Sequence, residues 1–210
     1  MSGSGKAMQE NVVWHNGHLE RPERWEALGH GGATLWLTGL PASGKSTIGT
    51  MLERDLVTAG RPAYVLDGDN LRHGLTSDLG FDAASRAENV RRVAHVAAIL
   101  ADAGAVAIVS LVSPYAVDRL HAREIHEHAG LPFAEVFVDT PLEECERRDP
   151  KGMYAKARAG VIPGFTGIGA PYEAPEAPEM TITPDEPMEQ AVWRLAQTLE
   201  ALAPEPEAIA

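Results

Sequence analysis

The sequence predicts an α/β fold in which helices cover both faces of a mainly parallel sheet of five strands. Short apolar runs alternate with amphipathic stretches along the chain, and most of these runs are apolar throughout. Glycines stand where the amphipathic stretches end, as helix C-termini favour. The 210 residues, of which 44% are hydrophobic, suffice for one domain with a substantial core.

The order of the elements follows from the same alternation. The expected strands are the apolar runs at residues 34–38, 63–66, 106–111, 135–138 and 180–183. Three amphipathic stretches, each followed by a glycine, predict helices at residues 46–59, 85–103 and 116–129. Thr140 and Pro141 are expected to cap and begin a further helix that ends at Arg148. Ligands of parallel sheets bind beyond the carboxyl ends of the strands, so the segments that follow the strands are the expected site.

A glycine-rich loop follows the first expected strand. Residues 39–46, GLPASGKS, match the phosphate-loop pattern GxxxxGK[ST] at every fixed position. In such a loop backbone N–H groups and the start of the next helix bind an anion, while Lys45 can reach the β and γ phosphates and Ser46 can bind Mg²⁺. We therefore expect a phosphate-loop NTPase fold of three α/β/α layers. The residues expected at ATP in this loop are Gly39, Leu40, Pro41, Ala42, Ser43, Gly44, Lys45, Ser46 and Thr47.

A pair of carboxylates follows the second expected strand. Residues 67–70 read DGDN and precede Arg72. Asp67 and Asp69, at a strand end beside the phosphate loop, can orient Mg²⁺ and accept a proton from an attacking hydroxyl. A calcium loop would need glycine where Arg72 stands, whereas an Asx turn stays an alternative for either aspartate.

The next segment carries groups suited to a second ligand. Phe81 precedes a predicted helix with Arg86 and Asn89, which are three residues apart and share a helix face. The ring of Phe81 can stack on a planar base, Asn89 can hydrogen-bond to it, and arginines can bind phosphate or sulfate. This segment is the expected site of an anionic acceptor with a planar base.

Charge and cysteine content limit the function classes. The formal net charge is −12, and most of it lies in residues 171–210, so nucleic-acid binding is not indicated. The single cysteine, Cys145, excludes an internal disulfide, and no long apolar segment suggests a signal peptide or a membrane helix. We expect a soluble cytoplasmic protein. Solvated helix faces are the expected positions of Arg54, Arg119, Arg123 and Arg194, and a polar helix end that of His121, His126 and His128.

Composition also divides the chain. Residues 1–32 are expected to be a leader and an N-terminal arm, which packs on the domain or on a partner, and residues 204–210 an acidic tail. Residues 33–203 would then form the domain. Within it, residues of about 149–179 are rich in Gly and Pro and contain Tyr154, Phe165 and Tyr172, which predicts a lid.

Taken together, these motifs resemble the adenylylsulfate kinase (APS kinase) family. The resemblance runs from about residue 14 to the final helix, through TGLPASGKST, DGDNLRHGL, DLGF, SRAENVRRVA, SLVSPY, RDPKGMYAKARAG and FTGIGAPYEAPEAP. The family uses ATP to phosphorylate the ribose 3′-hydroxyl of adenosine 5′-phosphosulfate (APS), which gives the sulfate donor PAPS. The resemblance implies this activity with Mg²⁺ in sulfate assimilation, a homodimer and a functional link to an ATP sulfurylase.

The resemblance also implies roles for single residues. Asp67 would take the 3′-hydroxyl proton and help Ser46 hold Mg²⁺, Lys45 would act in catalysis, and Arg147 would contact ATP. Ser113 matches the family's phosphorylated serine. The residues implied at APS are Asp69, Arg72, Phe81, Arg86, Asn89, Val112, Ser113, Lys151 and Phe165.

The pathway of the phosphoryl group is a separate question. A serine needs an activating base to become a nucleophile, and the neighbours of Ser113 in SLVSPY supply none, which favours direct in-line transfer. Two rival functions stay open: another small-molecule phosphate-loop kinase, and a catalytically silent nucleotide-binding paralogue. A GTPase is disfavoured because the guanine-reading NKxD motif is absent from the sequence.

Overall fold

The computed structural model describes residue 15 and residues 17–203, so the predicted leader up to residue 14 and the acidic tail lie outside the described residues. Five strands form one sheet in the order β2-β3-β1-β4-β5, and every neighbouring pair is parallel. The strands are β1 (Ala33–Thr38), β2 (Ala63–Asp67), β3 (Val106–Ser110), β4 (Phe133–Val138) and β5 (Met180–Ile182). The predicted five-stranded parallel sheet is confirmed.

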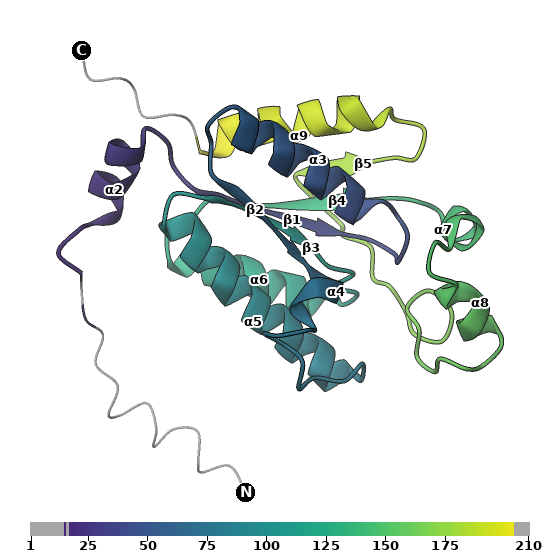
Figure 1. Ribbon diagram of the computed structural model, residues 1–210. Helices are drawn as coiled ribbons and strands as arrows, with labels where there is room; N and C mark the ends of the chain where they lie inside the picture. The colour runs from purple at the N-terminus through teal and green to yellow at the C-terminus, as the bar shows by residue number, and fades with distance from the viewer. Residues whose placement is uncertain (1–14, 16, 204–210) are drawn as a thin grey trace, which may run out of the picture.

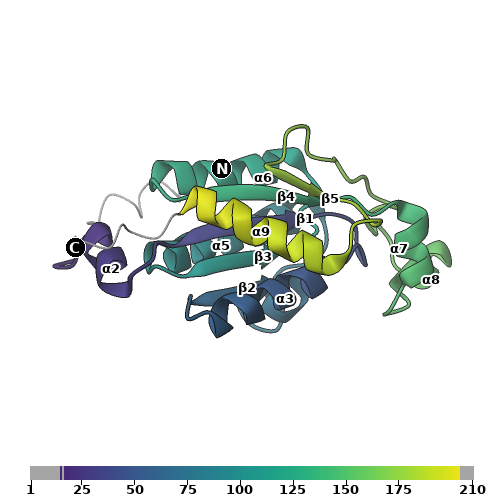
Figure 2. The ribbon, with the colours of Figure 1, turned by 90° about the horizontal axis from the view of Figure 1, so that it is seen from above.

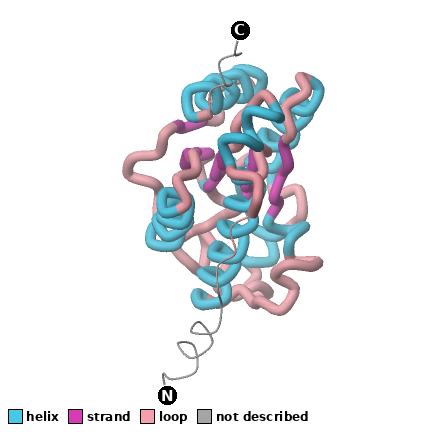
Figure 3. The backbone as a smooth tube through the Cα atoms, turned by 90° about the vertical axis from the view of Figure 1, so that its left-hand side faces the viewer, coloured by secondary structure: helices cyan, strands magenta, loops and turns pink. Residues whose placement is uncertain are grey.

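Helices cover both faces of the sheet. The helices α3 (Lys45–Thr58) and α9 (Met188–Leu202) lie on one face, and α5 (Ala83–Asp102) and α6 (Ala116–His128) lie on the other (Figures 1 and 2). Figure 3 shows the strands enclosed between these helices. The three-layer α/β/α architecture predicted from the sequence is therefore confirmed.

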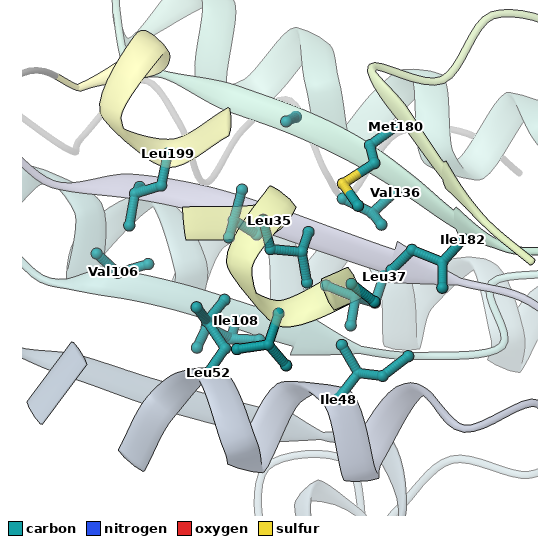
Figure 4. Packing of buried hydrophobic residues seen from close by; sticks show 14 of the residues in the cluster. Leu35, Leu37, Ile48, Leu52, Val106, Ile108, Val136, Met180, Ile182 and Leu199 are labelled. Carbon is teal, nitrogen blue, oxygen red and sulfur yellow. The ribbon is translucent and has the colours of Figure 1, made fainter. Parts of the chain in front are cut away.

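The core explains why the strand sequences are apolar throughout. Every residue of β1 is buried, because its side chains alternate between two helix layers. On one face Leu35 and Leu37 pack with Ile48 and Leu52 of α3 and with Leu199 of α9 (Figure 4). The opposite face packs against α5 through another buried set, which contains Trp36, Ala107, Val109, Val90, Val93, Ala94 and Ala97.

The register brings three strand ends to one level. Ser110 of β3 lies opposite both Asp67 of β2 and Leu37 of β1. The loop that follows β1 therefore begins beside the carboxylate at the end of β2. Two further helices lie at this edge of the sheet, namely α7 (Leu142–Arg148), which precedes the predicted lid, and α8 (Met153–Arg158), which lies within it.

The ends of the helices agree with the sequence except at α7. Gly60, Gly104 and Gly130 follow their helices with φ of 87°, 93° and 61°, the left-handed conformation that favours glycine. At α7, Pro141 is itself the N-cap, in extended conformation. Thr140 does not cap the helix, because its Oγ1 donates to the carbonyl of Ser43 at 2.9 Å.

The described part of the N-terminal arm contains a helix, α2 (Arg21–Leu28), that the sequence analysis did not predict. Arg21 and Arg24 both pair with Asp102 at the end of α5, at 2.7 and 2.8 Å. Trp25 Nε1 donates to the carbonyl of the same residue at 3.1 Å. This helix packs on its own domain, at the end of the molecule opposite α7 and α8 (Figure 1).

Two side chains expected at the surface of α6 are buried. Arg119 is 3% exposed and pairs with Glu135 at 2.5 Å, and His126 is fully buried, with Nε2 2.9 Å from Thr34 Oγ1. Both expectations were wrong because the polar partners come from β4 and β1, which no local pattern in α6 reveals. Within the described ranges, no helix is both long and apolar enough to cross a membrane.

Candidate active site

The phosphate loop connects β1 to α3, and its glycines are required by the backbone. Gly39 has a φ of 151°, and a Cβ there would lie 2.5 Å from the carbonyl oxygen of Val138. Gly44 has a φ of 112° and directly precedes the first helical residue, Lys45. The loop is also held from outside, because Thr140 Oγ1 and Arg148 Nη1 both donate to the carbonyl of Ser43, at 2.9 and 3.2 Å.

Lys45 is nearly buried inside this loop. Its Nζ donates to the carbonyls of Gly39 and Leu40 at 2.9 and 2.7 Å, and to Ser43 Oγ at 3.2 Å. Burial lowers the pKa of Lys45 to about 8, although Asp67 and Asp69 oppose this shift. The loop therefore concentrates an ammonium group and a helix N-terminus at one point, which suits a polyphosphate.

Ser46 and Asp67 meet at the mouth of the loop. Ser46 Oγ donates to Asp67 Oδ2 at 2.6 Å and lies 3.2 Å from Ser110 Oγ. The other carboxylate oxygen of Asp67 accepts from the backbone N–H of Asp69 at 2.9 Å and of Asn70 at 3.3 Å, as the N-cap of the one-turn helix α4 (Gly68–Leu71). A hydroxyl and a carboxylate held together are oxygen donors of the kind that Mg²⁺ prefers.

A second group of predicted residues lies around α4 and the segment that follows it. Lys151 forms an ion pair with Asp69, which connects the lid to α4. The guanidinium of Arg72 lies over the ring of Phe81, 4.1 Å from its centroid, and donates to the carbonyls of Leu79 and Gly80. Phe81 is 67% exposed, so much of its surface remains open to a ligand.

Arg86 projects from α5 toward the same region, and Asn89 stands three residues further along this helix. Arg86 donates to the carbonyls of Phe81 and Gly164, both at 2.7 Å, and to the hydroxyl of Thr166. Its guanidinium thus binds the lid to α5 in this structure. Asn89 is 6% exposed, and its buried Oδ1 has no hydrogen-bond partner among the residues the structure describes. A buried acceptor without a partner is costly, and a ligand donor would satisfy it.

Val112 and Ser113 form the turn after β3. Ser113 has a φ of 39° and is 4% exposed. Its Oγ donates to Thr38 Oγ1 at 3.0 Å and accepts from Trp36 Nε1 at 3.2 Å, while Thr38 donates to the carbonyl of Val112 at 2.8 Å. The hydroxyl of Ser113 is therefore hydrogen-bonded to a second hydroxyl and to an indole, and neither group can act as the base that would activate it as a nucleophile.

The predicted lid contacts the phosphate loop near its start and the ends of two strands near its end. At the start, Tyr154 in α8 donates from its hydroxyl to the carbonyl of Pro41 at 3.0 Å, and Phe165 contacts its ring edge-on at 4.9 Å. At the end, the hydroxyl of Tyr172 lies 3.0 Å from Thr38 Oγ1, and its ring stacks on Phe137 at 5.9 Å. The aromatic residues of the lid thus contact the loop and the adjoining strand ends.

One predicted site residue lies away from the loop. Arg147 is 73% exposed and its hydrogen bonds go to Glu144. The neighbouring Arg148 reaches Ser43 instead. The structure also places Thr140 at the loop, through its hydrogen bond to Ser43. Residues 139–140 follow the fourth expected strand and so belong to the segments that were expected to form the site.

Comparisons with known proteins agree with this geometry. The family described as Adenylylsulphate kinase matches residues 31–183, which is more than half of the chain. The adenylyl-sulfate kinase of Saccharomyces cerevisiae is 54% identical over 179 residues, which cover 85% of this chain and 88% of the relative. The bifunctional enzyme CysN/CysC of Mycobacterium tuberculosis is 49% identical over 201 residues, but these span 94% of this chain and only 32% of the length of that relative.

A solved structure is similar over most of the fold. The APS kinase CysC of Mycobacterium tuberculosis, in complex with AMPPNP and APS, superposes with a TM-score of 0.79 and 54% sequence identity. The match covers 80% of this chain and 98% of that one.

Proposed function

This chain belongs to the adenylylsulphate kinase family, and on that premise we propose that it transfers the γ-phosphoryl group of ATP to the ribose 3′-hydroxyl of APS. The products are PAPS and ADP, and the reaction belongs to sulfate assimilation. The hydrogen bond between Ser46 and Asp67 is the observation that carries the proposal, because it joins the phosphate loop to the carboxylate of the acceptor side. The complex of the similar CysC structure with AMPPNP and APS supports the choice of substrates.

ATP binds along residues 39–47 in this proposal. Lys45 exchanges its contacts with the loop carbonyls for the β and γ phosphates. The sequence analysis expected Arg147 to contact ATP, but we assign this role to Arg148. Arg148 donates to the carbonyl of Ser43 in the loop, whereas Arg147 donates to Glu144. The proposed donor side thus comprises the loop, Lys45 and Arg148.

A magnesium ion fits the oxygen atoms of Ser46 and Asp67. Mg²⁺ is commonly bound by one or two protein oxygens together with substrate phosphates. When bound, the ion would neutralise charge on the β and γ phosphate oxygens. Asp67 keeps one oxygen on the N–H groups of Asp69 and Asn70, which orients the other toward the hydroxyl of Ser46.

APS binds on the far side of Asp67. The adenine stacks between Phe81 and Phe165, and the unpartnered Oδ1 of Asn89 accepts a hydrogen bond from it. Arg72 and Lys151 bind the phosphosulfate, and Arg86 contributes by holding the lid against α5. Asp69 and the turn at Val112 and Ser113 complete the acceptor side.

Transfer is direct and in line. Asp67 accepts the proton of the 3′-hydroxyl as that oxygen forms its bond to the γ phosphorus. The bond between the γ phosphorus and the bridging oxygen breaks at the same time, and ADP leaves. Lys45 holds the phosphates, and the lid excludes water. Ser113 stays a structural hydrogen-bond donor, since its partners are Thr38 and Trp36.

The organisation of the protein remains part of the proposal. Residues 33–203 form the kinase domain, with a lid at about 149–179, and two copies associate as a homodimer. A functional link to an ATP sulfurylase is also part of the proposal, and the similarity to one part of a bifunctional enzyme shows that a chain of this kind can be fused to a second activity. The cytoplasmic location stays a prediction, and the single buried cysteine supports it.

An acceptor panel tests the activity. The purified chain is incubated with ATP, Mg²⁺ and one of four acceptors, namely APS, AMP, shikimate or gluconate, and ADP release is measured. We expect rapid turnover with APS alone. Turnover with another acceptor and none with APS would identify a different small-molecule kinase, and no turnover with any acceptor would support a silent paralogue.

A further inference from the structure

Arg119 is a buried arginine whose guanidinium binds one carboxylate and two backbone carbonyls. It lies in α6, is 3% exposed, and its Nε pairs with Glu135 of β4 at 2.5 Å. Its Nη1 donates to the carbonyl of Ser113 and its Nη2 to the carbonyl of Glu173, both at 2.7 Å. Burying a charge is costly unless it is paired and hydrogen-bonded, and here all three nitrogens are used.

The ion pair with Glu135 uses only Nε, so the two terminal nitrogens need acceptors of their own, and both find them in backbone carbonyls. Ser113 and Glu173 are far apart in the sequence, because Ser113 follows β3 and Glu173 lies in the later part of the predicted lid. The left-handed φ of 39° at Ser113 is rare for a residue with a side chain and costs free energy. The bond from Arg119 to the carbonyl of that residue helps to stabilise this conformation.

Further contacts join the same two segments. We use "return limb" for residues 171–173, where the chain comes back from the lid. The N–H of Glu173 donates to the carbonyl of Pro114 at 2.8 Å, and its carboxylate accepts from the N–H of Ala116 at 2.7 Å. The guanidinium of Arg119 also lies 5.7 Å from the ring centroid of Tyr172. The return limb is thus fixed to the turn that carries Ser113.

We propose that Arg119 is a positioning residue, which holds the return limb and the turn at Ser113 in register so that lid and turn close on the acceptor together. This inference rests on the proposed function, because it assigns the acceptor to that turn and to Phe165 in the lid. None of the hydrogen bonds of Arg119 goes to the phosphate loop. Its effect therefore falls on APS more than on ATP.

Two variants separate the carbonyl bonds from the ion pair. In Arg119→Lys, one ammonium can still pair with Glu135 but cannot reach two carbonyls as a planar fork does. In the matched control Glu135→Gln, the guanidinium keeps both carbonyl bonds. We expect Arg119→Lys to raise the KM for APS about tenfold, as the loss of a charged hydrogen bond allows. The KM for ATP should change less than about twofold, and Glu135→Gln should leave both values near those of the parent.

A third variant covers the case in which Arg119→Lys does not fold. Glu173 is exposed, so Glu173→Ala removes the bond to Ala116 without burying a charge. We expect a smaller rise in the KM for APS and an unchanged melting temperature. The inference is overturned if Glu173→Ala leaves the KM for APS unchanged. It is also overturned if Arg119→Lys and Glu135→Gln each raise the KM for APS in proportion to the decrease in their melting temperature.

A measurement without catalysis separates this inference from the proposed function. Hydrogen exchange at the amides of Ala116 and Glu173 should be faster in Arg119→Lys than in the parent and in Glu135→Gln. Equal exchange in all three proteins would overturn the inference even if the chain phosphorylates APS. If the parent makes no PAPS, the proposed function fails, while the exchange still reports whether Arg119 anchors the return limb.

Discussion

Ser46 donates a hydrogen bond to Asp67 across 2.6 Å, although Ser46 lies in the first turn of α3 and Asp67 ends β2. The sheet register makes this contact possible, because β3 brings the ends of β1 and β2 to one level. The hydroxyl that we propose as a magnesium ligand and the proposed base therefore lie side by side. The proposed base catalysis depends on this pair of residues.

Asp67→Asn should abolish base catalysis while keeping the shape of the side chain. We expect the kcat for PAPS formation to fall by about 10² to 10⁴, the usual contribution of a general base. The amide oxygen can still accept from Asp69, so the fold around α4 should persist. Steady-state kinetics measures kcat, and the melting temperature shows whether the variant is folded. If Asp67→Asn keeps both the melting temperature and the kcat of the parent, Asp67 is not the base.

Ser113→Ala tests whether a phosphoserine is obligatory. Direct transfer predicts that kcat stays within about tenfold of the parent, since the variant loses only ordinary hydrogen bonds to Thr38 and Trp36. The measurement is PAPS formation under saturating ATP and APS. A loss as deep as that of Asp67→Asn, with label from γ-labelled ATP on Ser113 of the parent, would establish a covalent route instead.

Arg147 and Arg148 form a matched pair, because both pair with Glu144 but only Arg148 donates to the phosphate loop. Arg148→Ala should raise the KM for ATP about tenfold through the loss of a charged hydrogen bond at Ser43. Arg147→Ala should have little effect, since that side chain is exposed. Equal effects of the two substitutions would remove the structural reason for preferring Arg148.

Lys45 makes nucleotide binding depend on pH. Burial lowers its pKa to about 8, so the free protein loses this charge as the pH rises through that value. Bound phosphate anions favour the charged form and raise the pKa again, so binding at pH values somewhat above 8 takes up a proton. Calorimetric titration with AMPPNP and Mg²⁺ in two buffers of different ionisation enthalpy measures this uptake.

Lys45→Arg is the control for that titration, because a guanidinium stays charged throughout this range. Proton uptake should disappear in the variant, even if its affinity for AMPPNP is lower. Uptake that persists unchanged in Lys45→Arg would assign the titration to another group.

The sheet could be predicted from the sequence because its strands are buried on both faces. The run ATLWLT has no polar alternation, and all six of its residues are buried in β1. The phosphate loop could also be predicted from the sequence, because its pattern requires glycine at positions 39 and 44. Gly39 and Gly44 have the expected positive φ. Local pattern and fold agree at these positions.

Other features depend on contacts between distant segments. Arg119 looks like a surface residue within the polar sequence of α6, and only the folded chain brings Ser113, Glu135 and Glu173 to it. The six-residue helix α8 is too short to show a periodicity inside a segment rich in Gly and Pro. The exposure of Arg147 likewise depends on how α7 packs. The domain boundaries and the residue roles stay predictions.

The fate of the γ-phosphoryl group shows whether the chain phosphorylates the ribose of APS. The purified chain is mixed with γ-labelled ATP, Mg²⁺ and APS for a single turnover, and the labelled product is identified by mass spectrometry. We predict that the label appears in PAPS, as a phosphate on the ribose 3′ oxygen, in an amount equal to the ADP released. Label found only in inorganic phosphate, or in no product at all, would contradict the account.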